Sequence, residues 1–202
     1  SMSPIPLHKA LVLLEEINRF KKTSFYEHLR LSFANVIVFK VSNLRFGPEV
    51  GVGRARHDVP VVSEWLEEVE RVAGDLQELG DAEYPDAEIL LSDSRNLGTL
   101  LKGREISAVI TSPPYPNEKD YTRTTRLESV MLGFVNNKAE LREMKKTLLR
   151  SNTRGVYKED DDDLYIKKVP EIERIARKIE KRRIELGKTS GFERMYGRVT
   201  KL

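Results

Sequence analysis

Two short apolar runs in the middle of the chain constrain its fold most, because turn residues bound each of them. They are residues 87–91 and 106–111, and residues 94–101 between them have the pattern of a short helix. Apolar runs of this length are typical of buried strands. A strand, a helix and a second strand so close in sequence predict a parallel βαβ unit, whose functional edge lies at the carboxyl ends of the strands.

The rest of the chain is predicted to be mostly helical. Apolar residues recur at helical spacing in residues 7–20, 63–79, 125–134, 138–149 and 170–186. Residues 33–41 could form a buried helix or, from Val36, a strand. We expect Ser24 to cap the helix before them, with Glu27 as its reciprocal partner, and residues 45–59 to form a loop. The predicted fold class is therefore α/β, a mostly helical chain around a small parallel βαβ element.

This pattern divides the chain into three segments. Residues 1–84 are mainly helical, residues 85–135 carry the βαβ element, and residues 136–202 form a basic helical segment. The formal net charge is only +3, yet the first half of the chain is acidic and the second half is basic. A basic half is typical of proteins that bind polyanions, although solvated helices rich in Lys and Arg give the same pattern.

The composition excludes several classes of site. The 202 residues include no cysteine, which rules out disulfide scaffolds, cysteine–zinc sites and thiolate nucleophiles. The three histidines are scattered, so we expect no metal site. No apolar run approaches the roughly 20 residues that cross a bilayer, and the N-terminus lacks a charged-then-apolar leader. We therefore expect a cytoplasmic protein without a membrane partner.

The sequence Thr111-Ser112-Pro113-Pro114-Tyr115 follows the second apolar run directly. Two prolines form a rigid turn without backbone donors, so its carbonyl oxygens remain available as acceptors. The Ser112 hydroxyl and the Pro113 carbonyl could accept both protons of an exocyclic amine, while Tyr115 stacks on the ring that bears it. A plain strand-terminating turn or a proline-rich ligand is the simpler alternative.

This sequence resembles the catalytic motif of S-adenosylmethionine-dependent DNA methyltransferases that modify the N4 amine of cytosine or the N6 amine of adenine. The serine-first form favours cytosine N4. Residues 91–97 and 116–123 extend the resemblance, which covers residues 87–135 and, more loosely, residues 41–48. It implies a Rossmann-like methyltransferase fold, S-adenosylmethionine as cofactor, DNA as partner and a restriction–modification setting.

The resemblance also implies roles for individual residues. The catalytic set is Ser112, Pro113, Pro114 and Tyr115. Asp93 and Thr111 would contact the cofactor, and the DNA-contacting residues would be Lys119, Tyr121, Arg123 and Arg126. Asp93 could equally be a helix cap, and the last four residues could be ordinary surface side chains. Residues 136–202 could be a DNA-contacting insertion.

The family's glycine-rich cofactor loop is missing from this sequence. Gly51 and Gly53 are followed by a charged loop and Pro60, whereas the family has a helix at that point. We therefore expect a central fragment, incomplete and inactive alone, whose cofactor loop comes from a second chain or a missing N-terminal segment. Two alternatives stay open: an RNA base-amine methyltransferase, and a non-catalytic DNA-binding or assembly module that lacks the cofactor half.

Overall fold

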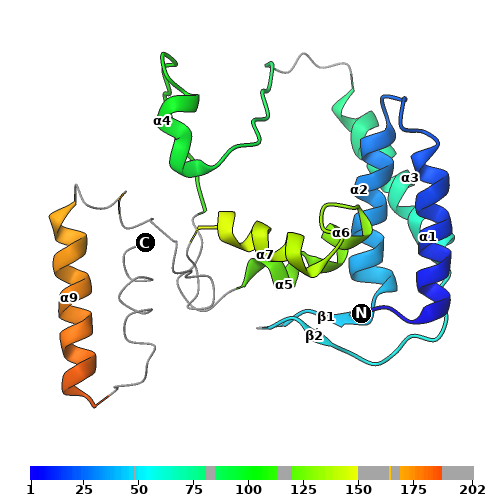
Figure 1. Ribbon diagram of the computed structural model, residues 1–202. Helices are drawn as coiled ribbons and strands as arrows, with labels where there is room; N and C mark the ends of the chain where they lie inside the picture. Colours follow the sequence, from blue (N-terminus) through cyan, green and yellow to red (C-terminus); the bar gives the residue numbers. More distant parts are fainter. Residues whose placement is uncertain (48, 81–84, 113–119, 150–163, 165–168, 188–202) are drawn as a thin grey trace. The chain divides into compact units, whose positions relative to one another are not determined.

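The computed structural model describes residues 1–47, 49–80, 85–112, 120–149, 164 and 169–187 (Figure 1). The chain divides into two compact units. The first comprises Ser1–Asp86 and Arg123–Asn136, and the second comprises Ala87–Thr122 and Asn137–Leu202. Helices dominate the described residues, and the strands among them form one two-stranded antiparallel sheet.

The first unit is built on two antiparallel helices near the N-terminus. Helix α1 (Pro4–Asn18) begins at a proline, which costs little there because an N–H in the first turn has no intrahelical partner. One face of α1 is buried, through Pro6, Ala10, Leu13 and Ile17. The helix predicted over residues 7–20 is thereby confirmed.

Helix α2 (Tyr26–Val36) continues into a π-helical turn, η1 (Ile37–Val41). The Ser42 N–H donates to the Ile37 carbonyl at 2.9 Å and closes this wider turn. Residues 33–41 are therefore helical, which decides between the two expected alternatives. The cap predicted at Ser24 is wrong, because α2 begins after Phe25 without a side-chain cap hydrogen bond.

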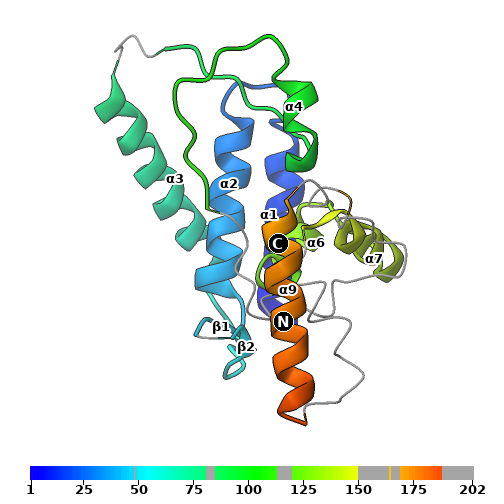
Figure 2. The same cartoon turned by 90° about the vertical axis from the view of Figure 1, so that its left-hand side faces the viewer.

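Helix α3 (Val61–Leu79) packs on α1 and α2, and the three helices lie side by side in both views (Figures 1 and 2). Its Trp65 indole N–H donates to the Leu29 carbonyl of α2 at 3.2 Å. The helix ends at Gly80, whose φ of 58° lies in the left-handed region that glycine enters readily. Its extent agrees with the prediction for residues 63–79.

The hydrophobic core of the first unit is shared by all three helices. Phe33, Ile37 and Val41 are fully buried at its centre, together with Ala10 of α1. Helix α6 (Arg126–Met131) covers the cluster with Leu127 and Met131. A hairpin of β1 (Leu44–Arg45) and β2 (Gly51–Val52) follows η1, with Leu44 opposite Val52.

The helices of the second unit bury few of their residues. A 3₁₀ turn, η2 (Ser94–Asn96), leads into α4 (Leu97–Leu100), so the helical stretch predicted at residues 94–101 is confirmed. Helix α5 (Tyr121–Thr124) begins in this unit and runs across its boundary. Helices α7 (Lys138–Thr147) and α9 (Pro170–Glu185) agree with the pattern of their segments.

The two predicted central strands do not form a parallel βαβ element in this structure. Residues 87–91 and 106–111 are neither helical nor paired as strands. Their large side chains are exposed, with Ile89 at 95%, Leu91 at 104% and Ile110 at 100%. A strand persists only where a neighbour takes up its backbone groups and another layer covers its apolar face. Neither condition is met among the residues that the structure describes.

Candidate functional site

The motif sequence begins at the last described residues of the segment 85–112. Thr111 and Ser112 are exposed, and neither hydroxyl has a hydrogen-bond partner among the described residues. Pro113, Pro114, Tyr115 and Lys119 lie outside the described residues. The described part of the structure therefore places the beginning of the predicted catalytic set and does not bring the set together.

Asp93, the predicted cofactor contact, caps the 3₁₀ turn η2. Its Oδ1 accepts from the Arg95 N–H at 2.9 Å, and the Arg95 guanidinium binds both carboxylate oxygens, with Nη2 2.5 Å from Oδ2. These hydrogen bonds hold the pKa of Asp93 below its ordinary value. Arg95 also donates to the Thr147 carbonyl, at the end of α7. The carboxylate is thus ionised and engaged by its own neighbour.

A second polar cluster joins the start of α5 to α7. Asp120 accepts from the Thr122 N–H at 3.1 Å and from its hydroxyl at 2.6 Å, and it pairs with Lys145 at 2.6 Å. Burial raises the pKa of Asp120, but the hydrogen bonds from Lys145 and Thr122 outweigh burial and leave the pKa below its ordinary value. This arrangement holds residues 120–122 against α7.

Two of the predicted DNA-contacting residues line a pocket in the first unit. Arg123 and Arg126 meet the hairpin residues Leu44 and Val52 around a volume of about 350 Å³. Arg123 pairs with Glu49 at 3.1 Å, whereas Arg126 is exposed and has no ion pair with any described residue. Tyr121, the other described member of this set, is exposed at the start of α5.

The basic helix α9 is a solvated amphipathic helix within the second unit. Several of its charges are paired along the helix, as in Arg174 with Glu171 and Arg182 with Glu185. Lys178 and Lys181 make no ion pair with a described residue, and they lie on one face because they are three positions apart. Both side chains are exposed.

Gly51 and Gly53 belong to the hairpin. Gly51 lies on β2 opposite Arg45, and the Gly53 N–H donates to the Asn43 carbonyl at 2.7 Å. A cofactor loop would need free backbone N–H groups before a helix, and Gly53 has already used its own. Within the described ranges no group of His, Cys, Asp and Glu side chains could hold a metal ion, and no helix is long and apolar enough to cross a membrane.

The Asp120–Lys145 pair was not singled out from the sequence. A local signal was present, because Asp at position 120 and Thr at 122 have the spacing of a carboxylate that accepts from the backbone two residues later. No local signal indicates Lys145, since it lies on another helix. The pocket wall formed by β1, β2 and α6 was missed for the same reason.

Comparison with known proteins gives one similarity that bears on activity. The chain is 31% identical over 142 residues to the Type II methyltransferase M.BsoBI of Geobacillus stearothermophilus, a match that covers 68% of this chain and 28% of that protein. The matched region thus spans under a third of its relative. No family model and no solved structure matches the chain.

A match of this extent necessarily includes the middle of a 202-residue chain, where Thr111-Ser112-Pro113-Pro114-Tyr115 lies. The similarity to a methyltransferase and the resemblance of these residues to a methyltransferase motif therefore concern the same segment. The similarity thus supports, at most, a distant relation of this region to the methyltransferases.

Proposed function

We propose that the chain is part of a DNA methyltransferase that transfers a methyl group from S-adenosylmethionine to an exocyclic amino group, with cytosine N4 favoured over adenine N6. The observation that carries this proposal is the Thr111–Tyr115 sequence inside a segment similar to a Type II methyltransferase. Methylation of carbon 5 of cytosine requires a cysteine nucleophile, and the chain has none.

The proposed chemistry depends on hydrogen-bond acceptors at the amine. The nitrogen lone pair of a base amine is conjugated into the ring, so the nitrogen is a poor nucleophile. Acceptance of its two protons by the Ser112 hydroxyl and the Pro113 carbonyl favours the pyramidal nitrogen that attacks. Tyr115 would stack on the flipped base, and Pro114 would keep the turn rigid. Positioning and electrostatics supply the rate enhancement without a covalent enzyme intermediate.

The cofactor S-adenosylmethionine supplies the methyl group in this proposal, but the described residues do not form a complete site for it. The Asp93 carboxylate is taken up by Arg95, and the Gly53 N–H is taken up by Asn43. Of the described residues considered for cofactor binding, only Thr111 has a hydroxyl without a hydrogen-bond partner among the described residues. We therefore expect weak cofactor binding by the chain alone, with the rest of the site in another segment or a second chain.

The first test distinguishes an exocyclic amine from a carbonyl at the same ring position. We expect the chain to bind duplex DNA with one unpaired cytosine about tenfold more tightly than the same duplex with unpaired uracil, because two acceptors repel the uracil O4. Ser112→Ala removes most of this preference. Ser107→Ala, in the same exposed segment, is the matched control and keeps it. Equal affinity of the wild-type chain for both bases contradicts the proposal.

The second test is isothermal titration with S-adenosylmethionine, with and without duplex DNA. DNA binding with little cofactor binding supports the target-handling part of a methyltransferase. Micromolar cofactor binding supports a complete enzyme. Tighter binding of the matching RNA oligonucleotide favours an RNA base-amine methyltransferase. If no methyl transfer is found with any added chain, the non-catalytic alternative is favoured, and the pairing of the Asp93 carboxylate with Arg95 agrees with that alternative.

A further inference from the structure

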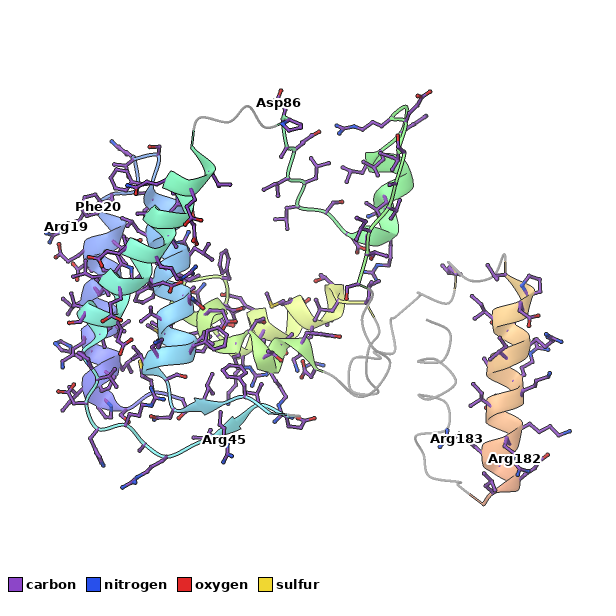
Figure 3. The ribbon with its side chains drawn as sticks, turned by 180° about the vertical axis from the view of Figure 1, so that it is seen from behind. Arg19, Phe20, Arg45, Asp86, Arg182 and Arg183 are labelled. Carbon is purple, nitrogen blue, oxygen red and sulfur yellow. The ribbon has the colours of Figure 1, made fainter. Side chains whose placement is uncertain are left out.

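The loop from Asn43 to Asp58 carries charge that no predicted role explains. Arg45, Arg54 and Arg56 are exposed on the hairpin and the residues that follow it. The side chains of Arg45 and Arg54 make no hydrogen bond or ion pair with a described residue. The Arg56 guanidinium donates to the Lys40 carbonyl, which leaves its charge unneutralised. Figure 3 shows Arg45 beside the two strands, directed away from the helices.

The acidic residues of the same loop do not cancel this charge. Asp58 pairs with Lys9 of α1 at 2.5 Å, and this contact lowers the pKa of Asp58. Glu49 pairs with Arg123 at 3.1 Å. Each carboxylate is thus matched by a cation from outside the loop, so the three loop arginines remain in excess.

Hydrogen bonds of Asn43 tie the hairpin and the residues after it to the N-terminus. The buried Asn43 donates to the Ser1 carbonyl through its backbone N–H at 2.9 Å and accepts the Gly53 N–H at 2.7 Å. Its side-chain Oδ1 accepts from the Arg56 N–H at 2.9 Å, and its Nδ2 donates to the Ser3 hydroxyl at 3.2 Å. One residue therefore ties both ends of the loop to the N-terminal unit.

The surface continues from the hairpin onto α6. Arg126 lies at the start of that helix, is exposed, and lines the pocket of about 350 Å³ together with Val50 and Val52 of the hairpin. A hollow with apolar walls and a guanidinium at its edge suits a sugar–phosphate chain, whose deoxyribose is apolar and whose phosphates accept from arginine.

We propose that Arg45 of the hairpin, Arg54 directly after the hairpin and Arg126 of α6 form a binding surface for the phosphate backbone of duplex DNA. The inference rests on the proposed function, which supplies DNA as the polyanion. It adds an element, the β1–β2 hairpin, that lies far in sequence from the motif. The hairpin would position the duplex without reading its sequence, because phosphate contacts carry no base information.

The test is the salt dependence of duplex binding, measured by fluorescence anisotropy on the full chain. The variant is Arg45→Gln with Arg54→Gln, since neither side chain makes a hydrogen bond or ion pair with a described residue. Each lost phosphate contact reduces the magnitude of the negative slope of log K against log salt by about 0.9, so for two contacts the expected decrease in magnitude is about 1.8. Lys21→Gln with Lys22→Gln, exposed after α1, removes the same charge and is expected to leave the slope nearly unchanged.

Every outcome has a defined meaning. A decrease confined to the hairpin variant supports the surface. An unchanged slope, or an equal decrease in the lysine control, overturns the proposed surface. Wild-type DNA binding in the same experiment still supports the proposed function. No DNA binding by the wild-type chain overturns both. An unchanged urea midpoint, followed by the fluorescence of Trp65, the single tryptophan, shows that each variant is folded.

Discussion

The two apolar regions of this chain behave differently although their sequences are similarly hydrophobic. In the first unit, Phe33 and Ile37 are fully buried where α1, α2 and α3 meet. In the second unit, Ile89 and Ile110 are almost completely exposed. A helix satisfies its own backbone and needs a partner for one face only, whereas a strand needs neighbours for its backbone as well. An apolar run therefore predicts burial reliably only where the N–H and C=O groups of its backbone are already hydrogen-bonded.

The largest effect should come from emptying the buried region. Phe33→Ala removes a fully buried ring and leaves a cavity, so we expect a loss of about 3–5 kcal/mol in the free energy of unfolding. Urea unfolding followed by Trp65 fluorescence measures it, because Trp65 lies in the same unit.

The matched control is Ile110→Ala, at a side chain that is 100% exposed. Its expected effect is within about 0.5 kcal/mol, as for other surface substitutions. A loss of similar size for the two variants would show that residues 106–111 are buried in solution and would remove the contrast between the two regions.

The helices were predictable from the sequence because their apolar spacing is a local property. Local residues mark these elements: α1 begins at Pro4 and carries an apolar stripe, and α3 ends at Gly80. The cap at Ser24 was mispredicted, since α2 begins after Phe25 and makes no side-chain cap hydrogen bond. The hairpin was expected to be a loop because strands of two residues are too short to show alternation.

The candidate site was predictable only where it is contiguous in sequence. Thr111 and Ser112 were identified from their neighbours, and the similarity to a methyltransferase covers them. The Arg123–Glu49 and Lys145–Asp120 pairs join residues that are distant in sequence. Such pairs depend on how the helices pack, which periodicity does not determine.

The next largest effect should come from Arg30, which joins α2 to the end of α6. Its guanidinium lies 5.5 Å from the centroid of the Tyr26 ring and 5.8 Å from that of Phe134, and it donates to the Leu132 carbonyl at 3.2 Å. We expect Arg30→Ala to cost about 2 kcal/mol in urea unfolding. Arg30→Lys keeps the charge and should recover less than half of this loss. Full recovery would mean that charge alone matters.

A smaller, pH-dependent effect is expected at Asp120, whose pKa is lowered below its ordinary value of 3.8. A carboxyl with a depressed folded-state pKa stabilises above the unfolded pKa and loses this contribution as the pH falls through the folded value. The protection factor of the Thr122 N–H, which compares its exchange rate with the intrinsic rate at the same pH, should therefore fall below about pH 4 in the wild-type chain. Asp120→Asn should abolish that dependence and cost about 1.5 kcal/mol locally at neutral pH.

Asp86→Asn provides the control for this titration, because Asp86 is exposed and makes no ion pair with a described residue. Its protection profile should match that of the wild-type chain at every pH. If the protection factor at Thr122 still falls with pH in Asp120→Asn, another carboxyl holds residues 120–122 in place.

The smallest expected effect is at α7. It tests whether local interactions stabilise the helices of the second unit, as they do the helices of the first. The Asn137 Oδ1 accepts from the N–H groups of Ala139 and Glu140, both at 2.9 Å, and so caps α7. Asn137→Ala should lower the protection of the α7 amides by about 1 kcal/mol, as is typical for loss of an N-cap. Asn137→Ser keeps an acceptor and should retain most of the protection. A large loss that also extends to residues 87–111 would show that α7 and the exposed segment unfold together, and the second unit would then be cooperative in spite of its open apolar surface.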